Sequence, residues 1–96
     1  MTLEAVKIKT ARDIWDLIRD FYQAFDYDFE EISIQSDDRR RNFLVALHRG
    51  SGEARIAQIE FDGYEQTLVY SLVMNNKAAV KSIFERETEF LKQHAC

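Results

Sequence analysis

The sequence predicts an α+β fold: a two-layer sandwich in which an antiparallel meander sheet carries two helices on one face, in the order β-α-β-β-β-β-α. Two segments, near residues 11–25 and 77–93, repeat apolar side chains at the spacing of an amphipathic helix. The residues between them form short runs rich in β-branched and aromatic side chains, separated by one charged loop and two glycine-containing turns. Strands joined by short turns pair antiparallel, and helices that bury one stripe pack on such a sheet.

Length and composition indicate one folded domain that spans residues 1–96. The chain is 46% hydrophobic and 31% charged, which is typical of a globular protein and not of a disordered one. A chain of 96 residues leaves no room for two domains.

The first predicted strand covers residues 4–9, with Val6 and Ile8 on one face. Thr10 and Asp13 fit a capping box, in which Thr10 caps the helix and Asp13 reaches back to the backbone. The helix then extends to about Phe25. Its apolar stripe consists of Ile14, Leu17, Ile18, Phe21, Ala24 and Phe25.

The remaining strands are predicted at residues 29–35, 43–48, 53–61 and 64–74, with a charged loop at 36–42. Asp62-Gly63 predicts a two-residue type I′ hairpin between the last two strands. Asn75 or Asn76 is expected to cap the final helix. The apolar stripe of that helix consists of Val80, Ile83, Phe84, Phe90 and Leu91.

The hairpin assigns the faces of the last two strands. The helix-covered face is predicted to carry Ala57, Ile59, Phe61, Leu68, Tyr70, Leu72 and Met74, and the opposite face Ile56, Gln58, Glu60, Thr67, Val69, Ser71 and Val73. The third strand is apolar on both faces, so Phe43, Val45 and Leu47 face either the helices or solvent. The outward orientation would expose an apolar patch and favour a homodimer through the sheet face.

Three features of the sequence predict a cytoplasmic protein. The single cysteine, Cys96, cannot form a disulfide within the chain. Residues 1–10 contain Glu4, Lys7 and Lys9 and lack the apolar core of a signal peptide. No apolar run approaches the roughly 20 residues that span a bilayer.

Charge is unevenly distributed along the chain. Residues 13–31 hold seven of the 17 acids and one of the 13 bases, which leaves ten acids and twelve bases elsewhere. Such an acidic zone repels phosphates and attracts a basic protein surface. Arg39, Arg40 and Arg41 offer an alternative nucleic-acid contact, but Asp37 and Asp38 precede them, and a solubilising loop is the simpler interpretation.

Tyr22 and Tyr27 lie beside carboxylates at the end of the first helix and in the following loop, a composition that suits a protein interface. Trp15 and Tyr22 lie about 20° apart on the helical wheel, with Arg19 on the same flank. These residue types are enriched among interface hot spots, although they also widen a core stripe. The predicted partner-binding residues are Trp15, Arg19, Tyr22, Asp26, Tyr27, Asp28, Glu30 and Glu31.

Catalytic and metal-binding patterns are lacking. The chain has no glycine-rich phosphate loop, nucleophile elbow or pair of histidines at ligand spacing, so we expect no cofactor and no metal. Glu87 falls within the apolar stripe of the last helix. There it would be a desolvated general base, or be paired with an arginine or histidine, or the end of the helix would overhang the sheet. The leading hypothesis is a non-enzymatic protein-binding domain of inhibitor, immunity or adaptor type. The alternatives are nucleic-acid binding through residues 39–41 and a small-molecule site near Glu87.

Overall fold

A computed structural model describes residues 4–37, 39–48, 55–74 and 77–95, except for the side chains of residues 29–31. It confirms the predicted order of elements. The strands are β1 (Glu4–Lys9), β2 (Asp28–Ser36), β3 (Arg40–His48), β4 (Arg55–Asp62) and β5 (Thr67–Met74), and the helices are α1 (Ile14–Phe25) and α2 (Ala78–His94).

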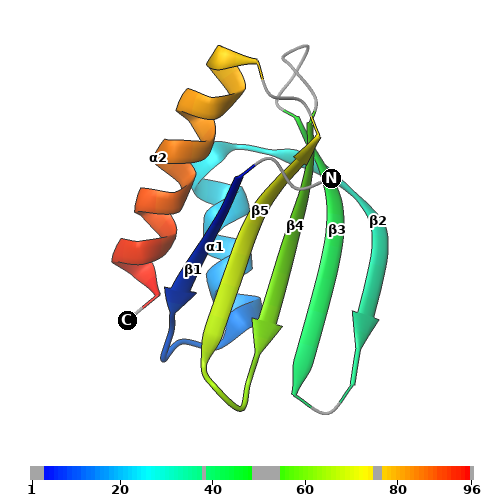
Figure 1. The fold of residues 1–96 in the computed structure, drawn as a ribbon, viewed down its shortest axis with the longest axis vertical. Coiled ribbons are helices and arrows are strands. Elements are labelled where there is room, and N and C mark those ends of the chain that lie inside the picture. The colour runs from blue at the N-terminus through cyan, green and yellow to red at the C-terminus, as the bar shows by residue number, and fades with distance from the viewer. Residues whose placement is uncertain (1–3, 38, 49–54, 75–76, 96) are drawn as a thin grey trace.

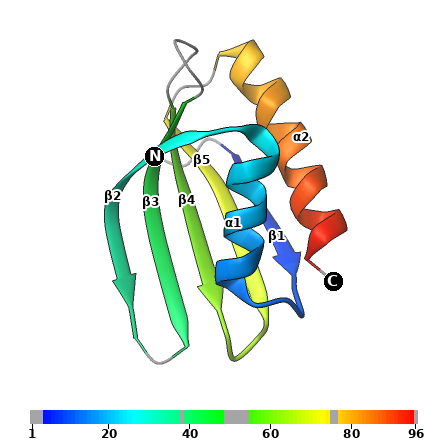
Figure 2. The same ribbon diagram turned by 180° about the vertical axis from the view of Figure 1, so that it is seen from behind.

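The sheet has the strand order β1-β5-β4-β3-β2, and every neighbouring pair is antiparallel. Strands β2 to β5 form the predicted meander, and β1 adds to the free side of β5 (Figure 1). The chain therefore crosses from one edge of the sheet to the other through α1. Both helices lie on one face, and β2 lies clear of both (Figure 2).

The core lies between the helices and the sheet. Phe43, Val45 and Leu47 are buried, and the register of β3 with β4 places them beside the buried Ala57 and Ile59 on the helix-covered face. The structure thus resolves the two predicted orientations of β3 in favour of the inward one. The homodimer through the sheet face was expected only if these side chains pointed outward and formed an exposed apolar patch. Because they are buried, that reason for expecting the homodimer no longer holds.

The β4–β5 turn differs from the prediction. Asp62 pairs with Thr67, so four residues form the turn instead of two. The Asp62 carboxylate accepts hydrogen bonds from the backbone N–H groups of Tyr64 and Glu65 at 2.9 and 3.3 Å. Gln66 adopts a left-handed conformation with φ of 58°. An aspartate that binds the turn's own N–H groups stabilises this longer turn, which the Asp-Gly pair alone did not indicate.

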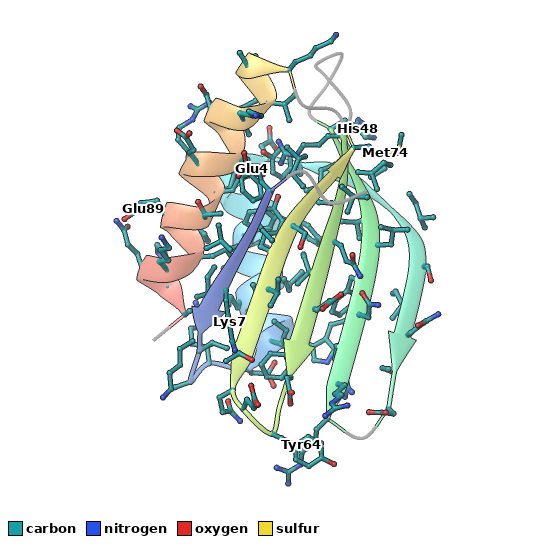
Figure 3. The ribbon with its side chains drawn as sticks, in the orientation of Figure 1. Glu4, Lys7, His48, Tyr64, Met74 and Glu89 are labelled. Atoms are coloured by element: carbon teal, nitrogen blue, oxygen red, sulfur yellow. The ribbon has the colours of Figure 1, made fainter. Side chains whose placement is uncertain are left out.

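The longer turn leaves the predicted faces of β4 and β5 unchanged except at Met74. A register shift between Ile56 and Ala57 pairs Ile56 with Met74. Met74 therefore shares the outer face with Ile56 and is 60% exposed, so its predicted place on the helix side is wrong. Figure 3 shows Met74 at the end of the sheet opposite Tyr64.

The helix caps also differ from the prediction. Asp13 caps α1, because its carboxylate accepts the N–H groups of Trp15 and Asp16. The Thr10 hydroxyl instead donates to the carbonyl of Ala95 at 2.8 Å and ties the end of α2 to the start of the first crossover. Lys77 occupies the cap position of α2, and residues 75–76 lie outside the described residues.

Candidate functional site

A groove of about 460 Å³ lies between α1 and β3. Most of its lining is apolar or aromatic side chain. The lining residues are Trp15, Ile18, Arg19, Tyr22, Gln23, Asp26, Tyr27 and Phe43. Five of the eight predicted partner-binding residues are among them.

The amphipathic pattern of α1 explains why one flank faces the groove. Ile14, Leu17 and Phe21 are buried against the core, so the neighbouring flank projects along β3. The Trp15 ring packs edge-on against Phe43, with 5.2 Å between ring centroids, yet 49% of Trp15 remains exposed. Trp15 thus both covers part of the core, as the simpler interpretation held, and presents an aromatic surface to solvent.

The end of α1 supplies the acidic part of the groove. Asp26 adopts a left-handed conformation with φ of 54°, which ends the helix and turns the chain toward β2. The next N–H group, of Tyr27, donates to the carbonyl of Tyr22 at 3.1 Å, as in a helix-terminating turn. This turn leaves the Asp26 side chain exposed in the groove lining and places Tyr27 half-buried beside it.

A buried ion pair lies on the inner side of Tyr27. Glu87 of α2 is fully buried and pairs with Arg55 of β4, whose side chain is 3% exposed. The Tyr70 hydroxyl donates to the other Glu87 oxygen at 3.0 Å, and Arg55 Nη2 also donates to the Tyr27 hydroxyl at 3.1 Å. Of the alternatives that the sequence left open for Glu87, the structure shows the buried residue paired with an arginine.

Burial dominates the titration of this cluster. Desolvation raises the pKa of Glu87, while the Arg55 guanidinium opposes the rise. Desolvation and the Glu87 carboxylate raise the pKa of Tyr27 to about 12 and that of Tyr70 well above its ordinary value. Because the Glu87 oxygens are occupied by Arg55 and Tyr70 and the residue has no exposed surface, the arrangement suits a structural ion pair and not a general base.

The remaining predicted residues lie outside the groove lining. Asp28 pairs across strands with His48, and because Leu47 points to the helices, Asp28 and His48 point to the opposite face. Glu30 and Glu31 belong to β2, but their side chains are not among those described. The structure therefore brings Asp26, and not Asp28, to the groove.

A second cleft of about 450 Å³ begins where the groove ends and shares Trp15 with it. Arg12, Arg39 and Arg41 line this cleft together with Asp13. Arg12 also donates to Asp20 at 2.7 Å and lowers the pKa of that carboxyl. The sequence contained no local signal for this cluster, because Arg12 and the arginines near β3 meet only once the helix has packed on the sheet.

Comparison with protein-family models, curated proteins and solved structures finds no match to this chain. Neither of the two described helices has the length and apolar character needed to cross a membrane. Within the described residues, no three histidine, cysteine, aspartate or glutamate side chains are grouped so as to hold a metal ion.

Proposed function

We propose that this chain is a non-enzymatic, cytosolic protein-binding domain that uses the groove between α1 and β3. The observation that carries the proposal is a single groove lined by a half-exposed tryptophan, two tyrosines and an arginine. Tryptophan, tyrosine and arginine dominate the energetics of protein interfaces. The occupant would insert an apolar or aromatic side chain over Phe43, next to Trp15.

The charges of the groove favour a basic residue beside that anchor. Arg19 lies 3.3 Å from Asp16 and 3.6 Å from Asp20, so neighbouring carboxylates offset its charge. Asp26 faces solvent at the other end of the same lining. A lysine or arginine of the partner would meet Asp26, and the acids that follow in β2 would attract it at longer range. An inhibitor, an immunity factor or an adaptor would each act through such a contact.

The experiment is a tagged pull-down from source-cell lysate, with and without nuclease, read by mass spectrometry. Trp15→Ala removes the aromatic anchor, and Asp26→Asn removes one charge while retaining a residue type that tolerates a left-handed backbone. Tyr64→Ala and Glu89→Gln are the matched controls, because both side chains are exposed and lie away from the groove lining (Figure 3).

We expect one stoichiometric protein that survives nuclease treatment, is lost with Trp15→Ala, is weakened by Asp26→Asn and is retained by both controls. Recovery of nucleic acid alone would overturn the proposal and favour the arginine cleft. A protein captured equally by wild type and by both groove variants would place the binding surface elsewhere.

A further inference from the structure

The cleft at the start of α1 combines arginine side chains with an apolar floor. Arg41 pairs with Phe61 in the register of β3 with β4, and both lie on the helix-covered face. Trp15 of α1 closes the side toward the groove. Arg39 lies next to the β4–β5 turn, where its carbonyl accepts the N–H group of Gly63 at 2.7 Å. The volume of about 450 Å³ falls within the range of roughly 300–1,000 Å³ that is typical of small-ligand sites.

The positive charges of Arg39 and Arg41 are not matched by acids. Within the part of the chain that the structure describes, neither guanidinium takes part in an ion pair with an aspartate or glutamate. Arg41 Nη1 donates to the carbonyl oxygens of Asp37 and Arg40 at 2.5 and 3.4 Å, which fixes the side chain but leaves its charge, because carbonyls are neutral. The Arg39 guanidinium lies 5.4 Å from the centroid of the Tyr64 ring, also an uncharged group.

The acids around the cleft are engaged within the chain. Asp13 lines the cleft, but its carboxylate accepts N–H groups of the first turn of α1, whose partial positive charge offsets it. Asp20 forms an ion pair with Arg12 at 2.7 Å. The Asp37 carboxylate accepts the backbone N–H group of Arg40 at 3.3 Å. The charges of the two remaining lining arginines are therefore left for a bound anion to neutralise.

We propose that this cleft binds a phosphate monoester that carries a planar ring, the chemistry of a mononucleotide. A phosphate monoester carries a charge of about −2 near pH 7, and its oxygens accept guanidinium N–H groups in pairs. This charge matches Arg39 and Arg41 together, whereas a single carboxylate would leave one of them unmatched. Trp15 is 49% exposed and lies in the same lining, so the ring stacks beside it while the phosphate meets the arginines.

This site does not rest on the proposed function, although both use Trp15. Arg39 and Arg41 belong to the lining of the cleft and not to that of the groove. Loss of both arginines should therefore abolish phosphate binding and leave the capture of a protein through the groove intact. The two proposals can fail independently.

The test is a titration of the isotope-labelled full chain followed by NMR, with adenosine monophosphate, inorganic phosphate and adenosine as probes. Sodium chloride at the same ionic strength gives the baseline. We expect both phosphates to shift the signals of residues 39–41, and the nucleotide to shift also the indole N–H of Trp15, the single tryptophan. Stacking should make the nucleotide bind about fivefold or more tightly than inorganic phosphate. Adenosine, which lacks the phosphate, should bind more weakly than the nucleotide.

Arg39→Gln with Arg41→Gln should weaken nucleotide binding about tenfold or more, because charge-assisted hydrogen bonds are lost. Arg86→Gln with Lys92→Gln is the matched control: it removes the same charge from exposed positions of α2 outside the cleft lining and should bind as wild type does. Arg39→Gln alone keeps the hydrogen bonds of Arg41 and should give an intermediate loss in a chain with an otherwise unchanged spectrum.

Three results would each overturn the proposal. One is a set of shifts no larger than those with sodium chloride. Another is nucleotide binding that the two double variants reduce equally or leave unchanged. The third is a nucleotide that binds no more tightly than inorganic phosphate, because the planar ring would then contribute nothing.

Discussion

Replacing Glu87 by glutamine removes a buried negative charge and leaves the side-chain volume almost unchanged. Arg55 and Glu87 are 3% and 0% exposed, so the Arg55 guanidinium would stay buried without a carboxylate. Breaking one side of such a pair costs about 3–5 kcal/mol. At roughly 0.05–0.15 kcal/mol per residue, a chain of this length has a total stability of about 5–15 kcal/mol. Glu87→Gln should therefore remove a large fraction of the free energy of unfolding.

Urea unfolding followed by circular dichroism measures this loss, with Glu89→Gln as the exposed control, expected within about 0.5 kcal/mol of wild type. The double variant Arg55→Met with Glu87→Leu should be more stable than Glu87→Gln alone, because apolar side chains replace both charges. A loss below about 1 kcal/mol for Glu87→Gln would contradict the reasoning, since an unpaired buried charge costs more. So would a double variant less stable than Glu87→Gln.

Three further predictions concern Tyr27, Gly63 and Asp13. Folding raises the pKa of Tyr27 from 10.0 to about 12, so the unfolded chain binds fewer protons in that interval and stability falls as pH rises through it. Tyr27→Phe should flatten the fall in urea-unfolding free energy between these pH values, and an unchanged slope would refute the assignment. Gly63→Ala places a methyl group 2.8 Å from the Arg39 carbonyl oxygen, which should cost about 1–3 kcal/mol and lower Tm in calorimetry. Asp13→Ala removes the side chain that caps α1 and should lower the free energy of unfolding in urea by about 0.5–2 kcal/mol. An unchanged free energy of unfolding would contradict the role of Asp13 as the cap.

Periodicity was enough to predict the order of elements, because both helices bury one clear stripe and the strands are separated by turn residues. It failed where local and tertiary effects compete. Asp62-Gly63 indicates a tight hairpin, but the Asp62 carboxylate stabilises a longer turn through the N–H groups of Tyr64 and Glu65. Met74 lies on the outer face because the β4–β5 pairing contains a register shift. The alternation of side chains in the sequence does not reveal such a shift, so the prediction placed Met74 on the helix-covered face.

The candidate site was predictable only as far as it is local. Trp15 and Tyr22 share a flank of one helix, so their spacing predicted that they lie together. Asp26 and Asp28 are only two residues apart, yet the left-handed turn and the start of β2 send them to opposite sides. Arg55, the partner of Glu87, lies 32 residues away in sequence, and its position depends on how α2 packs on β4.

The central claim is that a partner protein occupies the groove beside Trp15, the single tryptophan of the chain. The most direct test is the fluorescence of Trp15, which is 49% exposed, as the captured partner is added to the Glu89→Gln control and to the Asp26→Asn variant. A tryptophan-free version of the partner, or selective labelling of Trp15, keeps the signal specific. Occupation of the groove predicts emission at shorter wavelength and protection from iodide quenching, with a weaker midpoint for Asp26→Asn. A bound partner that leaves both the emission and the quenching of Trp15 unchanged would contradict it.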